Sequence, residues 1–165
     1  MKPKTVIGRW RGKSVQKRQV ESIFGMVPGT EVLTLDGALP VEVLAPGDRI
    51  ITRNSGVAML KGVDHGRTMC ETVRVRAGSL GHDRPGMDTI LPSHQKVLIR
   101  DWRAKAIYGQ DQALIEAKRL VDGEYLRLQP AEQHMVFRLY FDEPQVIYAD
   151  GLELECATAP VMMAV

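Results

Sequence analysis

The sequence predicts an all-β domain, and three observations support this fold class. The 165 residues include 15 Gly and nine Pro, so turns are frequent, as in β-rich chains. Apolar residues recur in short alternating runs between these turns, which is the pattern of half-buried strands. Only one segment, QALIEAKRLV (112–121), can be written as a helix, and it fits a strand ending in a helical turn equally well.

The first strands are expected directly after residue 28. In TEVLTLDGALPVEVL (30–44), Asp36-Gly37 separates two apolar runs and predicts a hairpin, because both central residues of such a turn must accept a positive φ. The turn APGD (45–48) then precedes a third strand, RIITR (49–53). Later strands are expected within residues 70–78, 89–101, 124–129, 134–143 and 144–156.

Charge divides the chain into a basic start and a mildly acidic body, although the formal net charge is only +2. All 20 acidic residues follow residue 20, and the first 20 residues contain Lys2, Lys4, Arg9, Arg11, Lys13, Lys17 and Arg18. Such a segment can be a solvated terminus, or it can bind the domain body, nucleic acid, an anionic membrane surface or an acidic partner. Trp10 argues against a fully disordered tail, and SVQKRQVESIFGM (14–26) can be written as a short amphipathic helix capped by Ser14.

Composition and spacing exclude several classes of protein. No apolar run approaches the roughly 18 residues of a membrane span, and the first residues lack the apolar core of a signal peptide. A cytoplasmic protein is expected, with export by another route left open. Cys70 and Cys156 do not form a disulfide framework, and neither has a Cys or His at metal-ligand spacing. We expect no metal and no cofactor.

Several motifs occur in the order of one known family. PGT (28–30), the Asp36-Gly37 hairpin, LAPGD (44–48), AGSLG (77–81) and ADGLELE (149–155) follow one another along the chain. In this order they resemble the Hedgehog/intein (Hint) superfamily, and most of all the Hint-type domains of alphaproteobacterial proteins. The resemblance implies a compact, twisted, horseshoe-like all-β domain whose first strands lie beside its last. It divides the chain into a basic extension (1–24), a Hint-like domain (25–157) and a C-terminal tail (158–165).

The resemblance also implies a chemistry. In this family a Cys or Ser at the first residue of the domain attacks the carbonyl just before it. A Thr or Ser and a His of an internal T-x-x-H block polarise that amide and protonate the leaving amine. The scheme requires an activated nucleophile and a positioned acid beside one peptide bond.

The chain departs from this scheme at the nucleophile. Counting back from Pro28-Gly29-Thr30, the family pattern C-F-T-P-G-T places Gly25 at the cysteine position. Gly25 has no side chain that could attack a carbonyl, and no Ser, Thr or Cys lies between Ile23 and Gly29.

The internal block departs as well. Alignment on KVLIRD places Gln95 at the histidine position and Pro92 where Ser or Thr is expected, although a one-residue bulge would let Ser93 and His94 serve instead. Later in the chain, Arg138 and Pro144 stand where the family often has histidines. Cys156 lies near the end of the domain, where its thiol is a weak candidate nucleophile toward Gly25. The last residues, CATAPVMMAV (156–165), lack the His-Asn pair of splicing inteins, so we expect no protein splicing.

Three functions follow as hypotheses. The first is a pseudoenzyme: a degenerate Hint domain that has lost autoprocessing and acts as a binding or structural subunit. Its basic segment and Trp10 would then join a protein partner or a larger assembly. The second is residual self-cleavage at Phe24–Gly25, with water as nucleophile and Ser93, His94 and Asp88 around the bond. The third is an anionic-surface or nucleic-acid binder acting through residues 1–20.

Overall fold

The computed structural model describes residues 23–158, which form an all-β fold with one short α-helix. The strands are β1 (Glu31–Thr34), β2 (Gly37–Pro40), β3 (Arg49–Thr52), β4 (Gly56–Met59), β5 (Gly62–Val75), β6 (Thr89–Pro92), β7 (Lys96–Ile99), β8 (Ala113–Glu116), β9 (Leu126–Tyr140), β10 (Gln145–Ala149) and β11 (Leu152–Cys156). The helices are the 3₁₀ turns η1 (Val41–Val43) and η2 (Ala117–Leu120) and the α-helix α1 (Trp102–Tyr108). The all-β prediction is confirmed.

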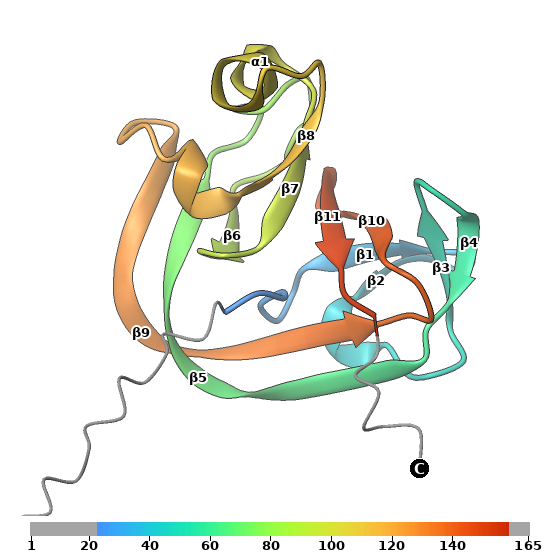
Figure 1. Ribbon diagram of the computed structural model, residues 1–165. Coiled ribbons are helices and arrows are strands. Elements are labelled where there is room, and N and C mark those ends of the chain that lie inside the picture. Colours follow the sequence, from blue (N-terminus) through green and yellow to red (C-terminus); the bar gives the residue numbers. More distant parts are fainter. Residues whose placement is uncertain (1–22, 159–165) are drawn as a thin grey trace, which may run out of the picture.

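Two long strands form the frame of the molecule. β5 and β9 pair antiparallel over almost their whole length, with one irregularity between Cys70 and Thr72. Figure 1 shows them curving together around one side of the domain, which gives it the horseshoe outline. β6 joins the free edge of β5, so the three strands make one sheet in the order β6-β5-β9.

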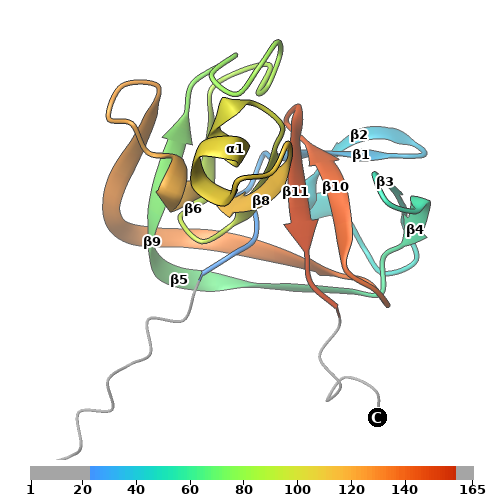
Figure 2. The ribbon, with the colours of Figure 1, turned by 45° about the horizontal axis from the view of Figure 1, so that its top comes forward.

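The second sheet brings the two ends of the domain together. It has eight strands, in the order β2-β1-β3-β10-β11-β7-β8 with β4 on β3. β1 also pairs with β10 at Val32 and Ala149, and the Glu31 N–H donates to the Asp150 carboxylate at 2.9 Å. The first strands therefore lie beside the last ones, as the family resemblance implied. The view from another side in Figure 2 agrees with this arrangement.

One apolar core joins both sheets. Alternating residues of the short strands point into it, as the period-two pattern requires. Its largest fully buried side chains are Met26, Ile50, Leu60, Leu91, Ile99, Ile115, Leu126, Leu139, Phe141, Ile147, Leu152 and Leu154. Met26 belongs to the segment before β1, so that segment is anchored in the core.

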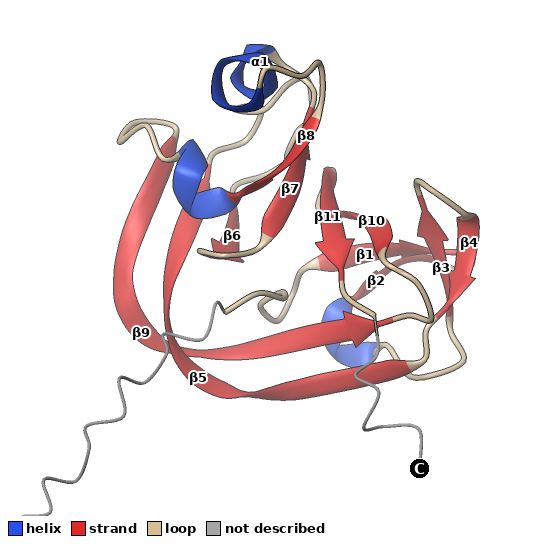
Figure 3. Ribbon diagram, in the orientation of Figure 1, coloured by secondary structure: helices blue, strands red, loops and turns tan. Residues whose placement is uncertain are grey.

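The helical expectations need correction. Figure 3 shows the only α-helix among residues 23–158 at Trp102–Tyr108, where none was predicted. Asp101 caps its start by accepting from the Arg103 N–H, and Gly109 ends it at φ +67°. The candidate helix 112–121 is instead strand β8 followed by the 3₁₀ turn η2, which was the alternative interpretation.

The hairpin and the late strands also differ in detail. The turn of the β1–β2 hairpin is Leu35-Asp36, and Gly37, already paired with Thr34, has the positive φ of the turn. The two strands expected within 124–129 and 134–143 are one continuous strand, β9, because β5 pairs with it across Pro130.

Glu153 organises the charges between the sheets. Its side chain is 5% exposed, and it accepts from Arg53 at 3.0 Å, from Arg84 at 3.2 Å and from Arg100 at 2.6 Å. Arg84 also donates to the Leu98 carbonyl at 2.8 Å. One buried carboxylate therefore connects β3, the loop before β6, the end of β7 and β11.

Replacing this carboxylate should destabilise the fold. Glu153→Gln leaves three guanidinium groups without their shared anion, and we expect it to lower the free energy of unfolding by about 3 kcal/mol. This is the lower end of the usual range, because Arg53 and Arg100 reach solvent. Urea denaturation measures the change. The control Glu132→Gln, at an exposed position of β9, should change stability by less than about 0.5 kcal/mol. Equal effects of the two substitutions would contradict the role of Glu153.

Candidate functional site

The segment before β1 is held between β9 and the loop that follows β6. The Met26 N–H donates to the Phe137 carbonyl at 2.9 Å, and the Phe137 N–H donates back to the Met26 carbonyl at 2.8 Å. The Ile23 carbonyl accepts from the His94 N–H at 3.3 Å. These bonds fix the backbone on both sides of the Phe24–Gly25 peptide bond.

Gln95 binds the nitrogen of that peptide bond. The Gly25 N–H donates to Gln95 Oε1 at 2.8 Å in a buried contact. Gln95 Nε2 donates to the carbonyls of Lys96 at 2.9 Å and Glu155 at 2.8 Å. Because both amide hydrogens are used, the oxygen must face Gly25. Gln95 thus accepts from the amide that a catalytic histidine would protonate, and a neutral carboxamide cannot supply that proton.

Arg138 binds the other side of the same peptide bond. Its Nε donates to the Phe24 carbonyl at 3.2 Å, and its guanidinium lies over the Phe24 ring, 4.8 Å from the centroid. A cation at a carbonyl oxygen polarises the C=O group. The site can therefore orient and polarise the Phe24 carbonyl, but Gly25 offers no side-chain nucleophile.

The backbone at Gly25 also excludes a side chain. Its φ is +128°, a region that L-residues rarely adopt. A Cβ at this residue would lie 2.5 Å from the Phe137 carbonyl oxygen and 2.8 Å from Val136 Cγ1. The absence of a nucleophile is therefore built into the packing of this segment against β9.

Ser93 and His94 lie next to the site, but within residues 23–158 neither side chain has a hydrogen bond to Phe24 or Gly25. Ser93 is buried, its N–H donates to the Glu71 carbonyl at 3.0 Å, and its own carbonyl accepts from the Lys118 N–H. The His94 ring pairs with Glu116 at 3.2 Å through Nδ1. In the hydrogen bonds of residues 23–158, it is Gln95 and not His94 that contacts Gly25 through its side chain.

Cys156 follows a residue that contacts the site, but its buried thiol is a poor nucleophile. It follows Glu155, whose carbonyl holds Gln95, and it is buried at the end of β11. Burial, with a smaller contribution from the Glu155 charge, raises the pKa of its thiol to about 12. Burial also raises the pKa of the Cys70 thiol. A thiol with such a pKa stays protonated, and hence a poor nucleophile, at neutral pH.

The other predicted residues do not converge on Gly25. Asp88 accepts from the Ala77 N–H at 2.9 Å and pairs with Arg74 at 3.3 Å. Pro144 lies in the exposed turn before β10, where its carbonyl accepts from Asn54. The basic residues Lys2, Lys4, Arg9, Arg11, Lys13, Lys17 and Arg18, together with Trp10, lie outside the described residues.

Sequence reasoning did not find the role of Arg138. Its position was noted as a departure from the family pattern, without a partner. The signal lay in the pairing of the segment around Met26 with β9, which places residue 138 beside Phe24, and this pairing joins residues more than 110 positions apart.

Residues 23–158 contain neither a metal cluster nor a membrane-spanning helix. Within this range, no three His, Cys, Asp or Glu side chains gather in a way that could hold a metal ion. None of the helices in the same range is long and apolar enough to cross a membrane.

Comparison with known proteins identifies the family. The model of the Hint domain family matches residues 24–160, so the chain belongs to the Hint domain family. A bacterial intein-like domain from Clostridium thermocellum is similar in structure, with a TM-score of 0.58 and 17% sequence identity. The similarity covers 82% of this chain and 99% of that one.

Two inteins are also similar in structure. A splice-inactive variant of the AceL NrdHF class 3 split intein has a TM-score of 0.54 at 11% identity, over 84% of this chain and 100% of the intein. The gp41-1 intein has a TM-score of 0.51 at 11% identity, over 81% of this chain and 98% of the intein. At these identities the similarity concerns the fold alone. No curated protein matches the chain significantly.

A side chain at residue 25 should be costly. Gly25→Ala places a Cβ against the Phe137 carbonyl at an unfavourable φ, and we expect a loss of about 2–4 kcal/mol in the free energy of unfolding. Gly66→Ala is the matched control, because Gly66 lies in β5 with an ordinary φ and a Cβ added to it would have no atom within 4 Å. Chemical denaturation of both variants checks this. A stability of Gly25→Ala equal to that of the control would show that the space at residue 25 is not restricted.

The two thiols should resist alkylation in the folded protein. Because the pKa of Cys156 is raised to about 12, its thiolate becomes abundant only as the pH approaches that value. At about pH 8, iodoacetamide should leave the native chain unmodified and add to both cysteines in denaturant, as read by intact mass. Rapid labelling of Cys156 in the native chain would contradict its protonated, buried state.

Proposed function

We propose that this chain is a Hint domain that does not process itself and that serves as a binding or structural module with its N-terminal segment permanently attached. The observation that carries this proposal is the state of the Phe24–Gly25 peptide bond. Its nitrogen is held by Gln95, its oxygen by Arg138, and residue 25 has neither a nucleophile nor space for one.

The chemistry of each missing step supports this proposal. An N–O or N–S acyl shift needs a hydroxyl or thiol on the residue after the carbonyl, and Gly25 has neither. Departure of the amine needs a proton donor at its nitrogen, where Gln95 instead accepts a hydrogen bond. The two thiols, Cys70 and Cys156, are both buried, and burial raises the pKa of each, which disfavours the nucleophilic thiolate. The chain thus has the fold of an autoprocessing domain, but the groups that would cleave the Phe24–Gly25 peptide bond are missing from its site.

Retention of the segment gives the fold a role as an anchor. Residues 23–27 are fixed by hydrogen bonds to β9 and to the loop at 94–95, and Met26 is part of the core. The basic residues that precede them would remain covalently joined to this rigid domain. A charged segment held in this way can contribute contacts to a protein partner.

A second candidate function is slow self-cleavage at Phe24–Gly25, and one observation favours it. Arg138 donates to the Phe24 carbonyl at 3.2 Å, which would stabilise negative charge on that oxygen if water attacked. Self-cleavage would still require a general base for the water and a proton for the Gly25 nitrogen.

Intact mass distinguishes the two functions. The purified full-length chain should remain one species of 18.4 kDa after prolonged incubation with dithiothreitol or with hydroxylamine, because no thioester or ester can form. Gln95→His should also remain intact, since it restores a proton donor but no nucleophile. Loss of the first 24 residues, with a new amino terminus at Gly25, would overturn the proposal and establish self-cleavage.

A further inference from the structure

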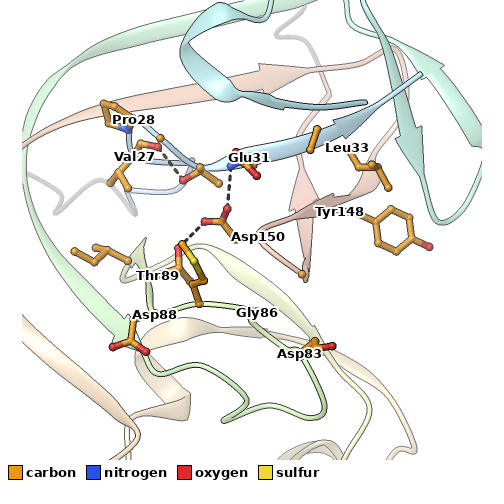
Figure 4. A pocket seen from close by; sticks show the side chains of 16 residues that line it. Val27, Pro28, Glu31, Leu33, Asp83, Gly86, Asp88, Thr89, Tyr148 and Asp150 are labelled. Carbon is orange, nitrogen blue, oxygen red and sulfur yellow. Dashed lines mark hydrogen bonds between the residues drawn. The ribbon is translucent and has the colours of Figure 1, made fainter. Parts of the chain in front are cut away.

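A large cleft lies on the face of the domain beside β1. Its volume is about 1000 Å³, and its walls come from the start of β1, the β1–β2 hairpin, the loop 83–88 with the start of β6, and the β10–β11 turn. Figure 4 shows Glu31, Thr89 and Asp150 meeting across it. The Phe24–Gly25 site does not line this cleft, but Val27 and Pro28 do.

The surface of the cleft is apolar with acidic residues around it. Its apolar lining consists of Val27, Pro28, Leu33, Ala38, Met87, Ile90 and Tyr148. Met87 is 79% exposed, and it lies beside other apolar residues of the cleft, so the apolar surface here is continuous. The charged lining residues are all carboxylates, and no Lys, Arg or His is among the lining residues.

Two of these carboxylates, Asp150 and Asp88, are held by hydrogen bonds to other parts of the fold, although Asp88 is itself exposed. Asp150 accepts from the Glu31 N–H and the Thr89 hydroxyl, and Asp88 accepts from Ala77 and Arg74. Glu31 is exposed, and within residues 23–158 its carboxylate has no hydrogen bond or ion pair. Asp83 is exposed as well and pairs only with the solvent-facing His82 ring in that range. The carboxylates of Glu31 and Asp83 are therefore accessible for ion pairs with Lys or Arg side chains.

One strand at the margin of its sheet also lines the cleft. β6 is the outermost strand of the sheet β6-β5-β9, and its residues Thr89 and Ile90 line the cleft. Three of the four residues of β6 are buried, so the cleft offers side chains and not an open strand edge to a binding segment. The cleft thus suits a basic segment that carries some apolar side chains.

The chain itself contains a segment of this chemistry. Residues 1–20 have seven basic and no acidic residues, and they include Val6, Ile7 and Trp10. The segment ends only a few residues before Val27 on the cleft wall. Twenty extended residues span up to roughly 70 Å, so the connection does not limit access. Covalent attachment raises the effective concentration of the segment to about the millimolar range, so a segment that binds the cleft with a millimolar or lower Kd is bound most of the time.

We propose that residues 1–20 bind in this cleft of their own domain, with their Lys and Arg side chains paired to Glu31 and Asp83. The inference rests on the proposed function, because only an uncleaved chain keeps the segment attached. It gives the retained segment an intramolecular binding site, from which an acidic partner would have to release it.

Zero-length carbodiimide crosslinking of the full-length chain tests this proposal. Lys2, Lys4, Lys13 or Lys17 should form amide bonds with Glu31 or Asp83, identified by peptide mass spectrometry. The yield should fall about fivefold or more in roughly 0.5 M NaCl, because exposed charge pairs are screened. In the double variant E31Q/D83N these crosslinks cannot form, because carbodiimide needs a carboxylate, so this variant confirms the assignment of the crosslinked residues. The matched control is D64N/E132Q, two exposed positions on β5 and β9, which should not change the yield.

An equal mixture of isotopically heavy and light chains separates the possible outcomes. Only heavy–heavy and light–light products support binding within one chain. Heavy–light products would overturn the proposal by making a second copy the occupant. Crosslinks to acids away from the cleft, or none from residues 1–20, would overturn it as well. Intact mass before crosslinking shows independently whether the segment is still attached, so a failure of the proposed function is recognised separately.

Discussion

The hydrogen bond from the Gly25 N–H to Gln95 Oε1 is the contact on which the interpretation of this domain depends. It is buried and 2.8 Å long, and the orientation of the Gln95 amide is set by two backbone carbonyls, those of Lys96 and Glu155. Three elements distant in sequence meet at this one side chain: the segment before β1, the start of β7 and the end of β11. An unpaired buried amide would be costly, so Gln95 also stabilises the closure of the domain.

The same contact supports the proposal that this Hint domain keeps its Phe24–Gly25 peptide bond. Chemistry at residue 25 needs a nucleophile, a polarised carbonyl and a proton for the leaving nitrogen. The site provides only the second of these, through Arg138 on the Phe24 carbonyl. The positive φ of Gly25 and its closeness to Phe137 exclude a side chain at this residue. The Phe24–Gly25 peptide therefore only joins the N-terminal segment to the domain. The cleft beyond Val27 has an apolar lining and only acidic charged residues. A basic segment that stays attached could therefore bind there through ion pairs and apolar contacts.

Sequence alone predicted the parts of the fold that depend on local pattern. The strands around β1, β3, β10 and β11 follow from alternation and turn residues, and the order of the motifs identified the family. The continuous length of β9 was missed because its polar middle, around Pro130, looks like a turn until β5 pairs with it. Helix α1 was missed although Asp101 and Gly109 provide its capping signals. Its seven residues are too few for a periodic pattern.

The candidate site was predicted only in part, because its contacts join residues that are far apart in the sequence. Gly25 and Gln95 were singled out by their positions in motifs, whereas their contact spans 70 residues and could not be read from spacing. Arg138 acts through a bridge between Met26 and Phe137 that no local pattern indicates. The cleft consists of side chains from four separate segments, so neither its existence nor its charge could be predicted before the fold was known.

The amide signal of Gly25 in ¹⁵N NMR spectra of the full-length protein, followed during hydrogen exchange and over days of storage, tests the central claim most directly. If the peptide bond is retained, as we propose, this signal should persist, and it should exchange far more slowly than an exposed amide, because the N–H is buried against Gln95. Disappearance of the signal in a folded sample, or exchange at the rate of a free peptide, would contradict this claim.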